Sequence, residues 1–248
     1  MSPVYDFDQR VILITGATGG IGQALSLALA AEGAQLVLCG RREAALGKLY
    51  DRIAQLGPEP AMAPAELAAL TPDAAAQLVR QIEESFGRLD GLCHCAATLP
   101  ALTPLRNLAP AAWYESLQVN LNAAFVLTQA CLGLLQASPD AAVLFSTDGI
   151  AREGRAYYGP YAVAKAGLEA LMRVLAHELE ANTPVRVNAV DPGPIRSALR
   201  TRISAEPPAR FAPPASALPA YLYLLSGAAR GVTGGSWAAS EPGPWDAG

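Results

Sequence analysis

The amino-acid sequence predicts an α/β protein with one domain, residues 1–248, built on a doubly wound, seven-stranded parallel sheet with helices on both faces. Short apolar runs alternate with longer Ala- and Leu-rich stretches along the chain. Such alternation is typical of parallel strands, because these need crossover helices between them. The short runs are almost continuously apolar, as strands covered on both faces are. With 248 residues, 52% of them hydrophobic, the chain can bury one large core.

The expected elements begin and end at local signals. Gly33 and Gly57 follow the first two helices, and the helix that begins after Thr71 has Pro72 in its first turn, which are ordinary stop and start signals. The expected strands are 11–14, 35–39, 61–63, 89–95, 142–146, 185–190 and 236–239. The expected helices are 21–32, 43–55, 72–86, 110–136, 161–180 and 215–225.

Two segments stand outside this alternation. Residues 192–214 are rich in Pro, Arg and Ala and are too long for a routine connection, so we expect a lid over the substrate site. A surface insertion without such a role is the alternative. The tail 241–248 is expected to fray.

Composition and charge exclude several classes of protein. The formal net charge is −4, whereas a nucleic-acid-binding domain needs a basic face. No uninterrupted apolar run approaches the roughly 18 residues that span a bilayer, and the first residues lack the pattern of a signal peptide. The four cysteines lie in apolar segments, as reduced core thiols do. We therefore expect a cytoplasmic protein that binds neither nucleic acid nor membrane.

A glycine-rich turn, Thr-Gly-Ala-Thr-Gly-Gly-Ile-Gly at 15–22, follows the first strand and opens the first helix. Backbone N–H groups and the positive helix end in such a turn can face a pyrophosphate, and the last glycine allows close packing of the helix on the sheet. A tight turn without a ligand is the structural alternative. The residues expected to contact a dinucleotide here are Gly16, Thr18, Gly20, Ile21 and Gly22.

The second strand is followed by Arg41 and Arg42, where a site that prefers NAD usually has an acidic residue for the ribose 2′-hydroxyl. Two guanidinium groups suit a 2′-phosphate instead. We therefore expect NADP as the cofactor, with NAD as the alternative. Arginines that merely solvate the start of the next helix would also explain the pattern.

Tyr161 and Lys165 lie four residues apart at the start of a predicted helix, so their side chains share a face. A phenol titrates near pH 10 in isolation, too high for an acid or base near neutrality. An adjacent ammonium together with an oxidised nicotinamide favours the phenolate. The pair therefore predicts acid–base catalysis.

These motifs resemble those of the short-chain dehydrogenase/reductase family, in its standard-length branch. The turn at 15–22 is similar to the family's TGxxxGxG motif, and Tyr161 and Lys165 are similar to its YxxxK motif. The resemblance extends over roughly residues 8–240, and it is strongest to a bacterial subgroup of uncharacterised short-chain oxidoreductases. It implies a Rossmann fold and hydride transfer between NADP(H) and a small or medium carbonyl or alcohol substrate.

The same resemblance implies roles for further residues. Asn120 matches the helix asparagine that holds a water in the family's proton relay, and Pro192 and Gly193 match a segment beside the nicotinamide. It also implies a homodimer or homotetramer packed through the helices 110–136 and 161–180.

Asp148 is the most informative departure from the family, which usually has a serine thirteen residues before the tyrosine. A serine hydroxyl donates to the substrate oxygen, whereas an ionised carboxylate only accepts. A carboxylate about 4 Å from a developing negative charge costs roughly 4 kcal/mol at an effective dielectric of about 20, or about three orders of magnitude in rate. Protonation of Asp148 would restore a donor, Ser146 on the same strand face is a second candidate donor, and loss of activity is the third alternative.

Other departures surround the coenzyme. The family's Asn-Asn-Ala-Gly segment after the fourth strand is His-Cys-Ala-Ala at 94–97 here. Glu66 replaces the aspartate expected near the adenine, and Ile195 stands where a threonine often binds the carboxamide. Glu66, Ala96 and Ile195 remain expected coenzyme contacts.

The Cys-His-Cys run at 93–95 does not predict a metal site. Alternation sends the two cysteines to one face of the strand and the histidine to the other, and a closed zinc site takes four ligands. Two functions therefore remain: an NADP-dependent oxidoreductase with Tyr161, Lys165, Asn120 and Asp148 in its catalytic site, or a catalytically weak or inactive nucleotide-binding sensor or partner protein on the same fold.

Overall fold

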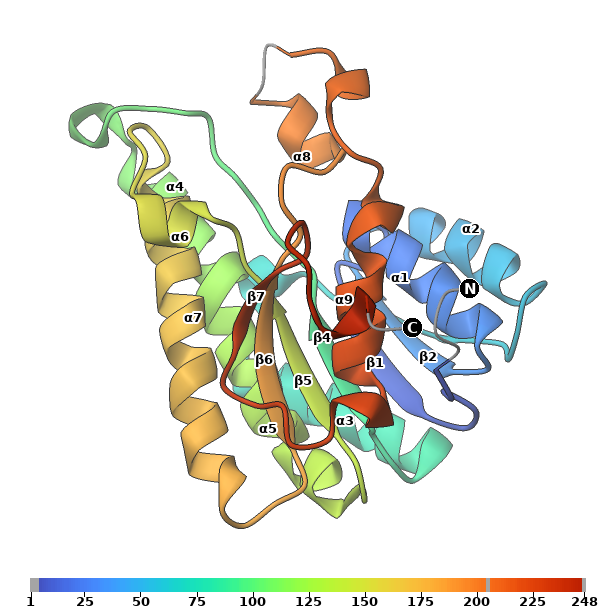
Figure 1. The fold of residues 1–248 in the computed structure, drawn as a ribbon. Helices are drawn as coiled ribbons and strands as arrows, with labels where there is room; N and C mark the ends of the chain where they lie inside the picture. The colour runs from blue at the N-terminus through green and yellow to red at the C-terminus, as the bar shows by residue number, and fades with distance from the viewer. Residues whose placement is uncertain (1–4, 204–205, 247–248) are drawn as a thin grey trace.

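The computed structural model describes residues 5–203 and 206–246. Seven strands form one parallel sheet in the order β3-β2-β1-β4-β5-β6-β7 (Figure 1), which confirms the predicted sheet. The strands are β1 (Val11–Thr15), β2 (Gln35–Gly40), β3 (Ala61–Pro64), β4 (Gly91–His94), β5 (Ala142–Ser146), β6 (Arg186–Asp191) and β7 (Ser236–Ala238). The strand order reverses between β1 and β4, so the crossovers on either side of this point run in opposite directions.

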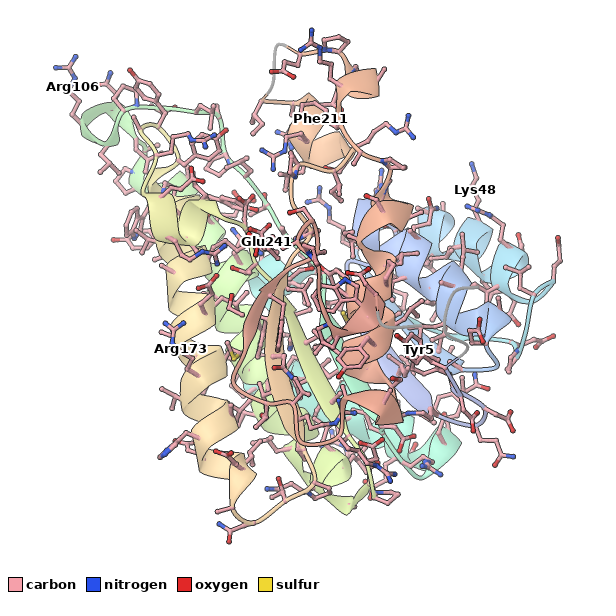
Figure 2. The ribbon with its side chains drawn as sticks, in the orientation of Figure 1. Tyr5, Lys48, Arg106, Arg173, Phe211 and Glu241 are labelled. Carbon is pink, nitrogen blue, oxygen red and sulfur yellow. The ribbon has the colours of Figure 1, made fainter. Side chains whose placement is uncertain are left out.

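Helices cover both faces of the sheet, and each face has its own apolar core. One core contains Ile12 and Ile14 of β1, and the other contains Leu13 between them, because side chains alternate along a strand. Lys48 and Arg173 point outward from the covering helices (Figure 2). The first face carries α1 (Gly20–Ala31), α2 (Glu43–Ile53) and α9 (Leu218–Leu225), and the second carries α3 (Pro72–Phe86), α5 (Ala123–Ala137) and α7 (Gly159–Glu180).

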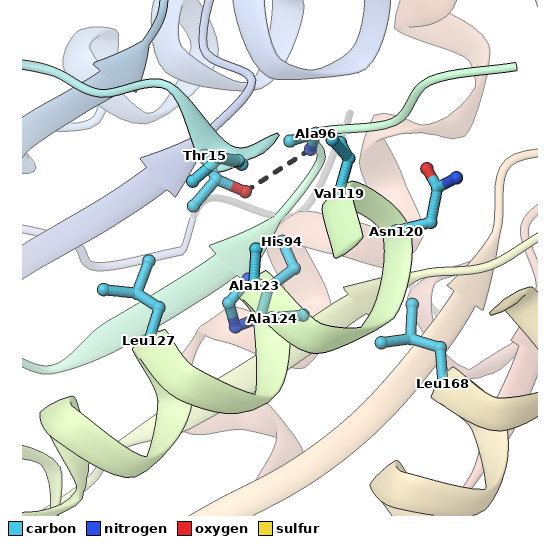
Figure 3. Close-up of a pocket in the computed structure, with 10 residues that line it drawn as sticks. Thr15, His94, Ala96, Val119, Asn120, Ala123, Ala124, Leu127 and Leu168 are labelled. Carbon is cyan, nitrogen blue, oxygen red and sulfur yellow. Dashed lines mark hydrogen bonds between the residues drawn. The ribbon is translucent and has the colours of Figure 1, made fainter. Parts of the chain in front are cut away.

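The predicted helix 110–136 is not one regular helix. It consists of α4 (Pro110–Leu117) and α5, joined by a π-helical turn over Gln118–Asn122. The turn holds Asn120 in a buried position beside a cavity of about 10 Å³ (Figure 3). Apolar periodicity missed it because α5 is apolar on most of its faces, so a change of phase leaves little trace in the pattern.

Among the described residues, the run Pro110–Ala137 is long and apolar enough to cross a membrane by length and composition. Uninterrupted apolar runs did not reveal this, because polar residues interrupt the helix. In the structure α5 packs on the sheet and on α3, and a core helix commonly has this composition.

Other predicted elements differ from the structure at their ends. The fourth strand, predicted over 89–95, is confined to β4. The last helix, predicted over 215–225, begins with a 3₁₀ turn at Pro214–Ala217, and α9 follows with Pro219 in its first turn. Proline favours that position because its missing N–H would have no helical partner there.

The prediction that the tail 241–248 frays is wrong for the part that the structure describes. Trp245 is buried in the core beside α9. Its ring centroid lies 6.4 Å from that of Tyr223 and 6.0 Å from that of Trp237. A large aromatic surface removed from water fixes this segment. Residues 247 and 248 lie outside the described part.

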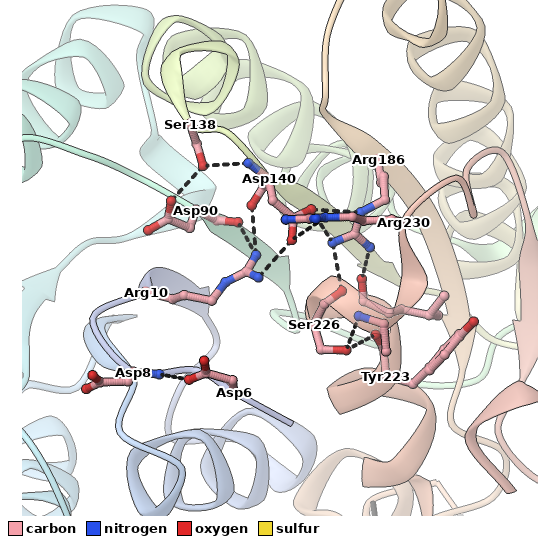
Figure 4. A network of polar contacts seen from close by, with 12 residues as sticks. Asp6, Asp8, Arg10, Asp90, Ser138, Asp140, Arg186, Tyr223, Ser226 and Arg230 are labelled. Carbon is pink, nitrogen blue, oxygen red and sulfur yellow. Dashed lines mark hydrogen bonds and ion pairs between the residues drawn. The ribbon is translucent and has the colours of Figure 1, made fainter. Parts of the chain in front are cut away.

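Buried ion pairs join the amino ends of the central strands, at the edge of the sheet opposite to the site described below (Figure 4). Asp140, before β5, accepts hydrogen bonds from Arg10 Nη1 and Arg186 Nη2, each at 3.0 Å. Asp90, before β4, accepts a hydrogen bond from the Ser138 hydroxyl at 2.6 Å. These contacts connect the residues that precede β1, β4 and β5 with the start of β6.

Candidate active site

A cleft of about 500 Å³ opens at the carboxyl ends of the central strands, next to the short helix α8 (Ala198–Thr201). The strand order reverses here, which is where open α/β sheets bind ligands. Every residue that the sequence analysis assigned to coenzyme binding or catalysis lines this cleft, except Gly22 and Asn120. Those two are buried behind it.

The glycine-rich turn forms the floor of one end of the cleft. Gly16 has a φ of +63°, and a Cβ at this residue would lie 2.6 Å from the Cα of Ala96. A Cβ on Gly22 would overlap the carbonyl oxygen of Gly16. The helix α1 starts at Gly20 without a side-chain cap, so its first N–H groups can serve an anion in the cleft.

Arg41, Arg42 and Glu66 line the same end of the cleft. Both arginines are exposed, and their forked donors fit a phosphate. Glu66 Oε1 accepts a hydrogen bond from the backbone N–H of Ala68 at 3.4 Å, so this carboxylate caps the 3₁₀ turn Leu67–Ala69. The glycine-rich turn, which has no room for a Cβ at Gly16, and the two guanidinium groups together fit a dinucleotide with an additional phosphate.

Three predicted catalytic side chains meet at the other end. The Tyr161 hydroxyl donates to Asp148 Oδ2 at 3.3 Å, and Lys165 Nζ donates to the carbonyl of Ser146 at 2.6 Å. Lys165 Nζ also lies 5.6 Å from the centroid of the Tyr161 ring. Because α7 places Tyr161 and Lys165 one turn apart, both face the end of β5.

The charges around Tyr161 differ from the expected arrangement. Burial raises the pKa of Tyr161 above its usual value, and the carboxylate of Asp148 raises it further. The cation that lowers this pKa is Arg200, which the sequence analysis did not single out. Burial also lowers the pKa of Lys165 to about 8.

Arg200 belongs to the segment 192–214, which lies over the carboxyl ends of the strands (Figure 1). Its Nη2 is 3.6 Å from Asp148 Oδ2. The segment is held by a bridge between Ile195 and Ala212, and Leu199 packs on the cluster that contains Tyr161. Residues 204 and 205 of the expected lid lie outside the described part. The concentration of arginines in 192–214 was the only sequence signal for this contact.

Ser146, the second candidate donor to a substrate oxygen, has another partner in the structure. The Ser146 hydroxyl hydrogen-bonds the hydroxyl of Tyr221 on α9. Thr147 points to the other face of the sheet and donates to Glu169 Oε1 at 2.9 Å. The strand β5 thus ends with both hydroxyl groups paired, and Asp148 is the residue after it that reaches Tyr161.

Asn120 fixes the chain that follows β4. Its amide nitrogen donates to the carbonyl of Thr98 at 2.8 Å and to Ser116 Oγ at 3.0 Å, and its Oδ1 accepts from the N–H of Thr98 at 2.9 Å. Both hydrogens of the Asn120 side-chain amide therefore have protein partners. A water at this side chain would have to donate a hydrogen bond to its oxygen.

The side chains of the Cys-His-Cys run separate as alternation predicts. The thiols of Cys93 and Cys95 lie 3.4 Å apart on one side of β4. His94 points to the other side, where its Nε2 is 2.8 Å from Thr128 Oγ1. Burial lowers the pKa of His94 to about 3, so this imidazole is neutral at physiological pH.

Comparison with known proteins agrees with this geometry. The chain matches the short chain dehydrogenase family over residues 10–208. It is 36% identical to the uncharacterized oxidoreductase YciK of Escherichia coli K12, over 92% of this chain and 90% of that protein. A short chain dehydrogenase from Salmonella enterica serovar Typhi has a TM-score of 0.94 at 35% identity, over 97% of this chain and 100% of the other. A protein of Escherichia coli CFT073 whose crystal structure contains NADPH has a TM-score of 0.92 at 35% identity, over 96% and 100% of the two chains. The protein therefore belongs to the short chain dehydrogenase family of oxidoreductases and has its Rossmann fold.

Proposed function

We propose that this protein is an NADP-dependent oxidoreductase that interconverts a small or medium carbonyl compound and the corresponding alcohol. The observation that carries the proposal is that the Tyr161 hydroxyl and the Lys165 ammonium face one cleft with the glycine-rich turn. A proton donor and a dinucleotide cradle in one cleft are the two parts that carbonyl reduction needs.

The coenzyme is proposed to bind with its pyrophosphate over Gly16, Thr18, Gly20 and Ile21 and its 2′-phosphate between Arg41 and Arg42. Glu66 would lie near the adenine, while Ala96, Pro192, Gly193 and Ile195 would border the rest of the coenzyme, and Gly22 lets α1 pack close to the turn. When bound, NADP(H) supplies or accepts the hydride. Support comes from the bound NADPH in the similar Escherichia coli CFT073 structure and from the two exposed guanidinium groups.

The protein's own groups would handle the proton. Tyr161 holds it on a hydroxyl that now donates to Asp148, and reorientation toward a substrate oxygen would deliver it there. Lys165 would bind a ribose hydroxyl and stabilise the phenolate left behind. Asn120 would support the proton relay by holding the segment after β4 in place. The 192–214 segment would cover the substrate.

The test is turnover of NADPH with a panel of aldehydes and ketones, beside calorimetric titration with NADPH and NADH. Turnover of one panel member together with tighter binding of NADPH supports the proposal. Absence of NADPH binding at millimolar concentration overturns it.

A second function, a nucleotide-binding sensor or partner protein without turnover, is favoured by one contact. The Tyr161 hydroxyl donates to a carboxylate, so its proton is directed away from a substrate. Under this function NADPH binds, the panel gives no turnover, and Asp148→Ser does not create any.

Replacing Gly16 by alanine is expected to weaken NADPH binding at least about tenfold. Alanine favours leaving the left-handed conformation, which would displace the turn, and regaining this conformation on binding costs roughly 1–2 kcal/mol. About 1.4 kcal/mol corresponds to a factor of ten in affinity. The Cβ would also meet the backbone of Ala96. Calorimetry with NADPH measures the change. Gly47→Ala is the matched control, because a Cβ there meets nothing within 4 Å. Equal affinities of the two variants would contradict the proposed cradle.

We also propose that the protein is cytoplasmic.

We further propose that it forms a homodimer or homotetramer through α4, α5 and α7. Apolar surface is exposed on these helices at Tyr114, Phe125, Val163 and Val174. Val174→Asp is expected to lower the mass measured by light scattering to that of a smaller assembly, because a buried unpaired charge opposes association. Leu56→Asp is the control, because Leu56 is 52% exposed, close to the 56% of Val174, and follows α2 outside the proposed interface. This variant should leave the mass unchanged. An unchanged mass for Val174→Asp would exclude this interface.

A further inference from the structure

We propose that Arg200 is a catalytic residue, a guanidinium donor that faces the substrate oxygen and offsets the charge of Asp148. This inference rests on the proposed function. The Asp148–Arg200 pair would together take the place of a neutral hydroxyl donor at position 148.

The geometry brings two groups, the Tyr161 hydroxyl and the Arg200 guanidinium, to one oxygen atom of Asp148. Asp148 Oδ2 lies 3.3 Å from the Tyr161 hydroxyl and 3.6 Å from Arg200 Nη2. The Tyr161 hydroxyl and the Arg200 guanidinium therefore adjoin the same carboxylate oxygen. A substrate oxygen that accepts the Tyr161 proton in this place lies within reach of the guanidinium as well.

Asp148, Tyr161 and Arg200 have different chemical roles in this arrangement. Asp148 is held by the backbone N–H of Ile150, which donates to its Oδ1 at 3.1 Å, so its carboxyl group stays beside Tyr161. An unpaired carboxylate about 4 Å from a developing alkoxide would slow the reaction by about three orders of magnitude. A guanidinium has five N–H donors, so Arg200 can pair with Asp148 and still donate to the substrate.

The position of Arg200 is defined by its segment. The N–H of Arg200 donates to Ser197 Oγ at 3.2 Å, which caps α8. Leu199 and Ile203, on either side of Arg200, pack on the cluster of Leu99 and Tyr161. The Arg200 side chain is only 20% exposed. This segment therefore carries a donor into the cleft.

In the reduction direction the carbonyl carbon gains the hydride, with its two electrons, from the reduced coenzyme. The C–O π bond breaks, and its electron pair becomes the charge on oxygen that Arg200 stabilises. Tyr161 then transfers its proton to that oxygen, which gives the alcohol and leaves the phenolate. Arg200 keeps all its protons throughout, because a guanidinium does not ionise in this range.

The experiment measures kcat, KM and NADPH affinity for Arg200→Ala, Asp148→Ser and the double variant, using the panel substrate that the wild type turns over. We expect Arg200→Ala to lower kcat about 10²–10³-fold, as loss of one oxyanion donor does, with NADPH affinity unchanged. Millimolar guanidinium should restore part of this activity, which a purely structural defect would not allow. In the Asp148→Ser background the same change should cost less than about tenfold, because a hydroxyl then donates and no carboxylate needs a partner.

Arg210→Ala, on the same segment but outside the cleft, is the control and should keep full activity. A kcat for Arg200→Ala within threefold of the wild type overturns the inference and leaves the proposed function standing. Equal losses in both backgrounds, or no rescue by guanidinium, also overturn it. Wild type that binds NADPH but turns over no panel member overturns both the inference and the proposed function.

Discussion

Tyr161→Phe is expected to lower kcat by about 10²–10⁴-fold, the range that a positioned acid or base contributes. The phenol hydroxyl is the proton carrier in the proposed reaction, and phenylalanine removes it alone. The ring would still pack on Leu99 and Ile150, so the fold and the affinity for NADPH should stay unchanged. Steady-state turnover, calorimetry with NADPH and thermal unfolding of both proteins measure these three quantities.

Tyr158→Phe is a matched control for this prediction. Tyr158 packs on the same cluster but lies outside the cleft lining, and its loss of a hydroxyl should leave kcat within about twofold. A Tyr161→Phe variant that keeps more than a tenth of the wild-type kcat would exclude Tyr161 as the acid.

Asp140→Ala is expected to destabilise the fold by about 3–5 kcal/mol, which is the usual effect of removing one partner from a buried ion pair. The guanidinium groups of Arg10 and Arg186 would lose the carboxylate that both contact at 3.0 Å. For a chain of this length the melting temperature should fall by roughly 10 °C. Denaturant unfolding and calorimetry provide the measurement.

The control is Arg230→Ala, since Arg230 contacts the same carboxylate at 3.8 Å with a side chain that is 75% exposed. An exposed pair contributes only about 0–1 kcal/mol, so this variant should unfold almost as the wild type does. Comparable losses for the two variants would show that burial does not set the strength of this network.

Acidification should remove the stabilisation that the Asp140 carboxylate gives to the fold. Burial alone would raise the pKa of Asp140, but the charges of Arg186 and Arg10 outweigh it and hold the pKa below its usual range. A carboxylate whose pKa is lowered on folding stabilises the protein above its unfolded pKa of about 3.9 and loses this effect as pH falls through the folded value. The stability difference between wild type and Asp140→Ala should therefore shrink below about pH 4.

The parts of the fold that depend on local pattern were predictable from the sequence. The glycine-rich turn could be placed because strand, turn and helix follow one another within residues 11–32, and the Tyr161–Lys165 spacing fixes a shared helix face. The contact of Asp148 with Arg200 could not be predicted in this way. It joins two segments that are 52 positions apart in the sequence, and it depends on how the 192–214 segment folds back.

Burial was the second property that the sequence did not reveal. The pattern predicted a cation-assisted Tyr161, but the direction of the pKa shift depends on how deeply the phenol is buried and on which carboxylate accepts its hydrogen bond. In the same way, Trp245 stands in a short tail rich in Pro and Gly, and only its packing against Tyr223 and Trp237 explains its burial. Both outcomes are set by tertiary packing, which overrides local composition.

The way residues 196–211 leave and rejoin the fold, through the pairing of Ile195 with Ala212, has an evolutionary consequence. Insertions or exchanges within that stretch displace no strand. The glycine-rich turn that binds the coenzyme can therefore stay the same while the end of the cleft near Tyr161 changes. Exchange of this stretch for that of another family member would change the proposed cover of the substrate and the charge at position 200 in a single step. New specificities on this scaffold are therefore accessible through changes confined to one contiguous piece of chain.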